Sequence, residues 1–155
     1  AGRASRIKER GLRVIAIIDI PQAVTAELNA AAFSLPFTAA RAYQPEASLE
    51  ELADLRVTVV PRGVTKTPLS RTALACEVQV DIGVQKKLVT CDNAEIDALL
   101  ALVDEIAEYF EQRHLTAIPE AIWVKTEHGP LYAAEHLDEL RQFTAVVTLT
   151  WRIAR

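Results

Sequence analysis

Two stretches of the chain alternate between apolar and polar residues, which is the pattern of a β-strand with one buried face. Over about 76–85, apolar side chains recur at every second position, and Glu77, Gln79 and Asp81 fall between them. Over about 143–153, apolar residues alternate in the same way with threonines and an arginine. Both stretches predict strands that cover a core on one side and meet water on the other.

Two other stretches place apolar residues three and four positions apart, which predicts amphipathic helices. The longer helix spans about 93–113 and follows Asp92, a suitable N-cap. The shorter helix spans about 21–32, with Asp19 as its N-cap and Pro21 near its first turn. The apolar face of the longer helix consists of Ile96, Leu99, Leu100, Val103, Ile106, Ala107 and Phe110.

Weaker signals fill the rest of the chain. β-Branched residues predict a strand over 55–60 that ends at Pro61, and the turn-rich segment 61–70 after it predicts a hairpin with a long, mobile tip. Residues 12–18 fit either an upstream extension of the first helix or a short strand. The other expected elements are a strand at 37–43, a loop at 46–54, a short strand at 122–125, a turn at 128–130 and a short helix at 134–141.

The order of these elements predicts an α+β fold. Consecutive strands with short links favour antiparallel pairing, and two amphipathic helices need a sheet face to cover. We therefore expect a mostly antiparallel sheet of four to five strands with the two main helices packed on one face. In this interpretation residues 14–155 form a single domain and residues 1–13 form a basic N-terminal arm.

Charge is distributed unevenly along the chain. Residues 1–13 contain five Lys or Arg and one Glu, a charge of +4, whereas the other 142 residues contain 12 Lys or Arg and 20 Asp or Glu, a charge of −8. An acidic body is not the footprint of a domain that binds nucleic acid. The arm fits a solvated tail, or a contact with phosphates or with an acidic protein surface.

The longer helix carries most of its carboxylates away from its apolar face. Glu95 and five others, opposed only by Arg113 near the helix end, give this surface its charge. Such a face is either simply solvated or turned towards something that it repels or towards basic partners. The five that we assign to a candidate acidic surface face are Asp97, Asp104, Glu105, Glu108 and Glu111.

No arrangement of residues in the sequence predicts chemistry. Phosphate-binding loops, the GxSxG motif and paired histidines with metal-ligand spacing are all absent, and Cys76 and Cys91 are fifteen residues apart. No apolar run is long enough to span a bilayer and no signal peptide is evident, so the cytosol is the default compartment. We expect a protein that works by contact, without enzymatic activity, cofactor or metal.

At this point the chain resembles the tail terminator, or tail completion, proteins of long-tailed bacteriophages. The resemblance covers residues 17–155 and leaves the arm outside. It lies in the order of elements and in the stretches IDIPQAVTAELNAA, FTAARAYQPEASLEELADLRVTVVPRG, SRTALACEVQVDIGVQKKL, EIDALLALVDEIAEYF and PLYAAEHLDELRQFTAVVTLTWRIAR.

The resemblance implies a structural virion protein that is assembled in the host cytoplasm and sits in the tail or neck. Members form a ring, usually hexameric, that caps the head-proximal end of the tail tube, stops its polymerisation and joins the tail to the head connector or head-closure protein. DNA passes through the lumen without specific binding, and the acidic face of the longer helix is one candidate for the lining of that lumen. On this reading the hairpin reaches a neighbouring subunit or the tube, and its candidate contact residues are Arg62, Val64, Lys66, Leu69 and Arg71.

Other readings of the same residues remain open. Another neck component, such as a head-closure or adaptor ring, shares the size and composition. A non-viral small α+β binding domain or enzyme would need a concave site with convergent polar groups, and no such set is evident. A module that binds nucleic acid would have to act through the arm at 1–13.

Overall fold

The computed structural model describes residues 15–43, 54–129 and 132–154. The predicted arm at 1–13 and all but the last residue of the loop predicted at 46–54 lie outside the described residues. The elements are α2 (Asp19–Ala30), β1 (Ala39–Arg41), β2 (Arg56–Pro68), β3 (Leu74–Lys87), α3 (Asn93–Phe110), β4 (Ile122–His128), α4 (Ala134–Leu140) and β5 (Gln142–Ala154).

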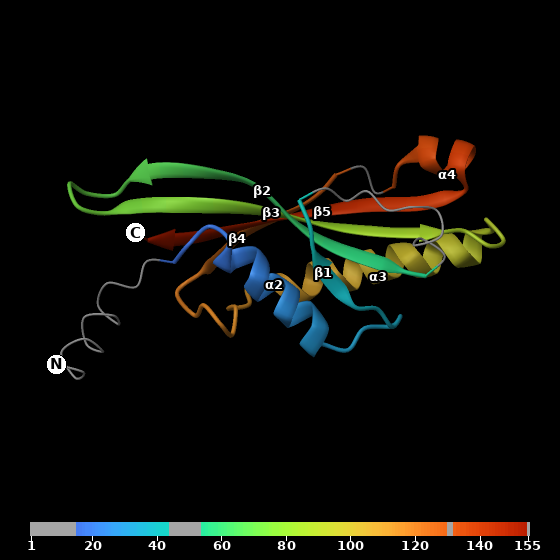
Figure 1. The fold of residues 1–155 in the computed structure, drawn as a ribbon, viewed down its shortest axis with the longest axis horizontal. Helices are drawn as coiled ribbons and strands as arrows, with labels where there is room; N and C mark the ends of the chain where they lie inside the picture. Colours follow the sequence, from blue (N-terminus) through green and yellow to red (C-terminus); the bar gives the residue numbers. More distant parts are fainter. Residues whose placement is uncertain (1–14, 44–53, 130–131, 155) are drawn as a thin grey trace.

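The strands form one five-stranded sheet in the order β1-β2-β3-β5-β4 (Figure 1). Three of its four pairings are antiparallel, and only the short β1 runs parallel to its neighbour β2. The last strand in the sequence, β5, lies between β3 and β4 in the interior of the sheet. The predicted α+β class and mostly antiparallel sheet are confirmed.

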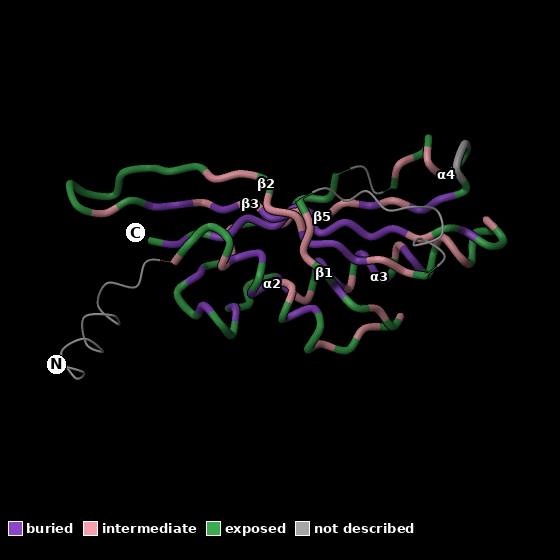
Figure 2. Tube along the Cα trace, viewed as in Figure 1, coloured by how far each residue is buried: buried purple, intermediate pink, exposed green. Residues whose placement is uncertain are grey.

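Both long helices lie on one face of the sheet, as the sequence predicted. Helix α2 lies against β1, β2 and β3, whereas α3 lies against β5. Alternate residues of β3 and β5 point into this layer, and Val80, Ile82, Leu149 and Trp151 are fully buried there. Figure 2 shows the buried positions running along the strands and the facing sides of the helices. The short helix α4 lies apart from α2 and α3, at one end of the sheet (Figure 1).

The helix ends differ from their predicted positions. Asp92 caps α3 as expected, because its Oδ1 accepts a hydrogen bond from the Glu95 N–H at 2.9 Å. The helix stops at Phe110 rather than near Arg113. Asp19 is not the N-cap of α2 but its first residue, and its carboxylate accepts a hydrogen bond from the Ala16 N–H at 2.8 Å. Residues 15–18 form a turn, neither strand nor helix.

The hairpin predicted around 61–70 is confirmed, but its long, loop-like tip is wrong. Residues 61–68 are not a loop but the second half of β2, paired with β3 as far as Pro68 and Leu74. The strand continues past Pro61, and the extra residue Arg62 forms a bulge between Pro61 and Gly63. The connection that remains is the short segment 69–73. The strand expected at 37–43 is shorter, because only 39–41 pair with β2.

Candidate assembly surface

The hairpin of β2 and β3 forms an arm that projects to one side of the molecule (Figure 1). We define the hairpin arm as residues 61–73. Its turn is closed by a hydrogen bond from the Leu69 N–H to the Ala73 oxygen at 2.9 Å, and Ser70 Oγ accepts a bond from the Ala73 N–H at 3.1 Å. The arm contains three cationic residues and no carboxylate. It is therefore an ordered, basic projection.

The five predicted contact residues divide between the strand and the turn. Arg62 is the bulged residue and is exposed, Val64 packs partly against the core, and Lys66 is exposed on β2. Leu69 and Arg71 lie in the turn, where Leu69 is 62% exposed. The structure thus places all five on one arm, but on two different parts of it.

The outer edge of the arm is an unpaired strand edge within the described part of the chain. β1 covers β2 only over Val57–Val59, and the Val59 oxygen accepts a hydrogen bond from the Ala42 N–H at 3.0 Å. The backbone groups of every second residue point to that same outer side. Once the bulge at Arg62 is counted, the outward residues of the arm are Pro61, Val64, Lys66 and Pro68.

These prolines define how much of the edge can pair. A proline has no N–H to donate, and it is tolerated in a strand where that position faces outward. Pro61 and Pro68 both occupy outward positions, so they interrupt nothing within the sheet. Only Val64 and Lys66, between them, present both an N–H and a C=O on the open side.

A second open edge lies on the opposite side of the sheet, along β4. The Gly129 N–H donates to the Val146 oxygen at 3.1 Å, so the alternate residues of β4 that face away from β5 are His128, Thr126 and, beyond the bulge at Val124, Trp123. No described segment pairs with this side. β4 contains no proline and is rich in residues that favour strands. Such an edge is a template for pairing with another strand.

The two open edges lie at the same level of the sheet. The row through Gln79 contains Gly63 on β2, Thr150 on β5 and Lys125 on β4. At this level the sheet has four strands, β2-β3-β5-β4. The bulge at Arg62 lies beside this row on one edge of the sheet, and the bulge at Val124 lies beside it on the other edge. Because each neighbouring pair is antiparallel, β4 runs opposite to β2.

The face of these four strands that lies opposite α2 and α3, here called the polar face, carries three ion pairs. Arg62 donates to Thr148 Oγ1 at 3.1 Å and lies 3.7 Å from Asp81, which accepts a bond from the Thr148 hydroxyl at 2.7 Å. Arg152 pairs with Glu77 at 2.8 Å. These contacts join β2, β3 and β5 across the sheet.

A third ion pair on the polar face belongs to β4. Lys125 and Glu127 are 2.7 Å apart, and each is exposed. The hydrogen bond and negative charge of Glu127 raise the pKa of Lys125, and the same bond and the charge of Lys125 lower the pKa of Glu127. The three cations and three carboxylates of these ion pairs neutralise one another.

Four of the five predicted acidic residues form an exposed stripe along α3. The stripe comprises Asp97, Asp104, Glu108 and Glu111, spaced at about two, one and one helical turns. Glu105 does not belong to it, because its carboxylate accepts hydrogen bonds from the Ser34 N–H and hydroxyl. Glu105 therefore holds the segment after α2.

The hydrogen bonds of two further carboxylates fix turns around α3. Glu95 accepts bonds from the Val89 and Thr90 N–H groups at 2.7 and 2.9 Å. Burial would raise the pKa of Glu95, but the bonds from Thr90 and Val89 and the charge of Lys86 lower it overall. Glu95 is thus structural, which separates it from the exposed stripe.

Glu27, on α2, is the second carboxylate whose hydrogen bonds fix a turn next to α3. It is buried and accepts bonds from the Thr116 N–H at 2.7 Å and the Tyr109 hydroxyl at 2.8 Å. Burial would raise its pKa, yet bonds from Thr116 and Tyr109 and the charge of Arg113 lower it overall. Arg113 in turn stacks on the Tyr109 ring, and its Nε–H donates a hydrogen bond to the backbone oxygen of Tyr109 at 2.7 Å.

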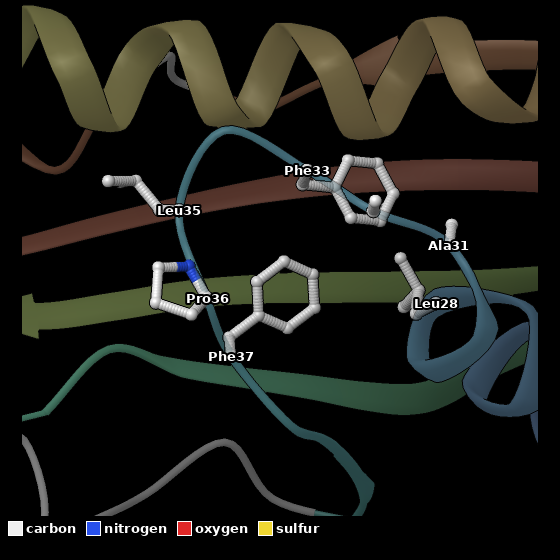
Figure 3. A pocket seen from close by; sticks show the side chains of 7 residues that line it. Leu28, Ala31, Phe33, Leu35, Pro36 and Phe37 are labelled. Atoms are coloured by element: carbon white, nitrogen blue, oxygen red, sulfur yellow. The ribbon is translucent and has the colours of Figure 1, made fainter.

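An open apolar pocket of about 300 Å³ lies where α2 leads into the segment before β1 (Figure 3). Phe33 and Phe37 stack within it, with ring centroids 5.4 Å apart. Figure 3 shows Leu28, Leu35 and Pro36 around the same space and no polar side chain among the labelled residues. None of these labelled side chains could therefore orient a substrate by a hydrogen bond.

The described residues contain no group of three or more side chains suited to hold a metal ion. Cys76 is buried in the core, and Cys91 is half-buried. No helix among the described residues is both long and apolar enough to cross a membrane. Trp151 is a core residue, whereas Trp123 is half-buried beside the open edge of β4.

Comparison with known proteins shows a similarity of fold. No protein-family model and no curated protein matches the chain. Over 93% of its length the chain has the fold of the sheath/tube terminator of an extracellular contractile injection system, PVC, solved in its extended state. The TM-score is 0.51, the sequence identity is 16%, and the chain spans 58% of that neighbour. The fold expected from the resemblance to tail terminators is therefore that of a solved terminator.

Proposed function

We propose that this chain is a tail terminator, a structural protein that assembles as a hexameric ring on the end of a tail tube. The observation that carries the proposal is the fold that it shares with a sheath/tube terminator over 93% of its length. The two open strand edges support it, because a protein with an unpaired edge on each side can join to further copies of itself.

The ring stops polymerisation by occupying the end of the tube. The exposed turn of the hairpin arm, with Leu69 and Arg71, makes the contact with the tube protein. Because that neighbour is named for a sheath as well as a tube, a sheath protein is a further partner in our proposal. In a bacteriophage the opposite face of the ring meets the head connector or head-closure protein, and the protein belongs to the virion.

DNA passes through the ring without specific binding. Phosphate binding requires clustered cations, but Arg62, Lys125 and Arg152 of the polar face are paired with carboxylates and the α3 stripe is acidic. Neither surface would retain a passing duplex. The chain performs no bond chemistry in this account, and it needs no cofactor.

The direct test is a polymerisation assay. Purified tube protein of the same tail is allowed to polymerise alone, with this chain, or with an equal amount of serum albumin as the control. We expect this chain to shorten the tubes and to leave a ring visible on one end in negative-stain images. Tubes of unchanged length with bare ends would overturn the proposal, and rings found only on head connectors would favour another neck component.

A further inference from the structure

We propose that the ring closes by strand pairing, in which the outer edge of β4 in one copy pairs with the outer edge of the hairpin arm, residues 61–68 of β2, in the next. The inference rests on the proposed function, since it names the contact by which the ring would form. Its occupant is a second copy of this chain. The result is one continuous sheet that runs around the ring.

The first argument is position. The two open edges lie on opposite sides of the same four strands and at the same level, on the row that contains Gly63 and Lys125. A contact between two different patches on opposite sides of a subunit is head-to-tail, and repeated head-to-tail contacts close into a ring when the rotation allows it. A contact between identical edges would instead give a closed dimer.

The second argument is strand direction. Going across the sheet, β2, β3, β5 and β4 alternate in direction, so β4 of one copy runs opposite to β2 of the next in a ring whose copies share one orientation. The new pair would therefore be antiparallel and would continue the alternation without a break.

The third argument is register. On β2 the flanking residues Pro61 and Pro68 have no N–H, which leaves Val64 and Lys66 as the outward residues able to make both ladder bonds. On β4 the outward residues include Trp123 and Thr126. A ladder limited to two residues by prolines admits few registers, which protects the arm from pairing with unrelated strands.

Strand pairing also fixes which face lines the hole. Six copies with four strands each, at about 4.8 Å per strand, give a circumference of about 115 Å and a diameter of about 37 Å before strand tilt widens it. A helix layer about 10 Å thick on the inside would take up more than half of that width. We therefore place the polar face inside and α3, with its acidic stripe, on the outside of the ring.

Two variants that differ from their controls in one backbone group test the pairing. Thr126→Pro removes an outward N–H of β4, whereas Thr126→Ala keeps it and loses the same hydroxyl, which accepts a bond from the Trp123 indole at 2.9 Å. Lys66→Pro and Lys66→Ala form the equivalent pair on β2, where the Lys66 side chain is exposed. We expect both alanine variants to form rings and both proline variants to form none in native mass spectra.

Mixing the two proline variants tests the head-to-tail arrangement and shows that each is folded. Lys66→Pro retains the β4 edge and Thr126→Pro retains the β2 edge, so an equimolar mixture should yield a heterodimer of about 34 kDa, twice the chain mass of 17.1 kDa, and nothing larger. Rings formed by either proline variant, or no heterodimer in the mixture, would overturn strand pairing and leave the proposed terminator standing. A wild-type chain that forms no ring, alone or with tail tubes, would overturn both.

Discussion

The Tyr109 hydroxyl donates a hydrogen bond to Glu27 Oε2 at 2.8 Å and thereby joins the two long helices. The other oxygen of Glu27 accepts the Thr116 N–H at 2.7 Å, so one buried carboxylate holds α2, α3 and the segment after α3 together. These helices support the sheet from one side. The contact therefore fixes α2 and α3 relative to each other on that side of the sheet.

Replacing this carboxylate should weaken the fold. We expect Glu27→Gln to lower the free energy of unfolding by about 1–3 kcal/mol, because an amide cannot accept charge-assisted bonds from both donors. Tyr109→Phe, which removes one donor and keeps the ring under Arg113, should cost about 0.5–1.5 kcal/mol. Urea unfolding at pH 7 measures both, and equal stability of wild type and Glu27→Gln would show that the carboxylate is not structural.

The same contact predicts a pH dependence. In the folded protein the pKa of Glu27 lies below the usual glutamate value of 4.5. The contribution of Glu27 to the free energy of unfolding is therefore complete above about pH 4.5 and is lost as the pH falls through the lowered pKa. The difference in unfolding free energy between wild type and Glu27→Gln should shrink on acidification. A difference that stayed constant from pH 7 to pH 3 would rule out this origin.

Adjacent positions of β3 should respond oppositely to the same substitution. Val80 is fully buried and Gln79 points to the polar face. Val80→Asp buries an unpaired charge and should cost about 4 kcal/mol or more, which leaves little folded protein. Gln79→Asp places the same charge among ion pairs in contact with water and should fold. Circular dichroism and soluble yield distinguish them, and a folded Val80→Asp would mean that the strand faces are reversed.

The turn of the arm should be dispensable for the ring but not for the tube. Replacing residues 70–72 with Asn-Gly, together with Leu69→Ser, gives the shortest common hairpin connection and keeps the hydrogen-bonded pair of residues 69 and 73 that closes the turn. We expect rings of normal size that no longer stop tube growth, because Leu69 and Arg71 are lost. If the shortened turn still caps tubes, these two residues make no contact with the tube.

Labels on opposite faces should lie at different radii of the ring. Asp104→Cys marks the acidic stripe of α3 and Glu127→Cys marks the polar face, each in a Cys91→Ser background because Cys76 is buried. Gold attached at 104 should appear on the outer rim, and gold at 127 in the central hole. The reverse result would place α3 in the lumen and would contradict a ring lined by the polar face.

The periodic elements could be predicted from sequence because their burial is one-sided. The alternation around Val80 and Leu149, and the apolar stripe of α3, identified the two central strands and the main helix. The strand predicted from sequence ends too early because Pro61, Gly63 and Pro68 are typical of turns. Only the pairing of β2 with β3 shows that both prolines face outward. The length of β3 was the signal that could have extended β2, because a strand that begins at Leu74 requires a partner strand that reaches equally far.

The open edges and the division of the carboxylates could not be predicted. Both depend on contacts between residues far apart in the chain. That β4 is an edge follows from the insertion of β5 beside β3, which no local pattern encodes. Glu105 appeared equivalent to Glu108 along the helix, but Ser34, 71 residues earlier in the chain, engages only Glu105.

Whether the chain assembles as a ring is tested most directly by native mass spectrometry over a concentration series, with the same samples viewed by negative stain. The measurement is repeated in the presence of tail tubes, because docking onto a tube can drive closure. We predict six-fold particles of about 103 kDa, six times the chain mass of 17.1 kDa, with a central hole. A monomer at every concentration, with and without tubes, would contradict the account.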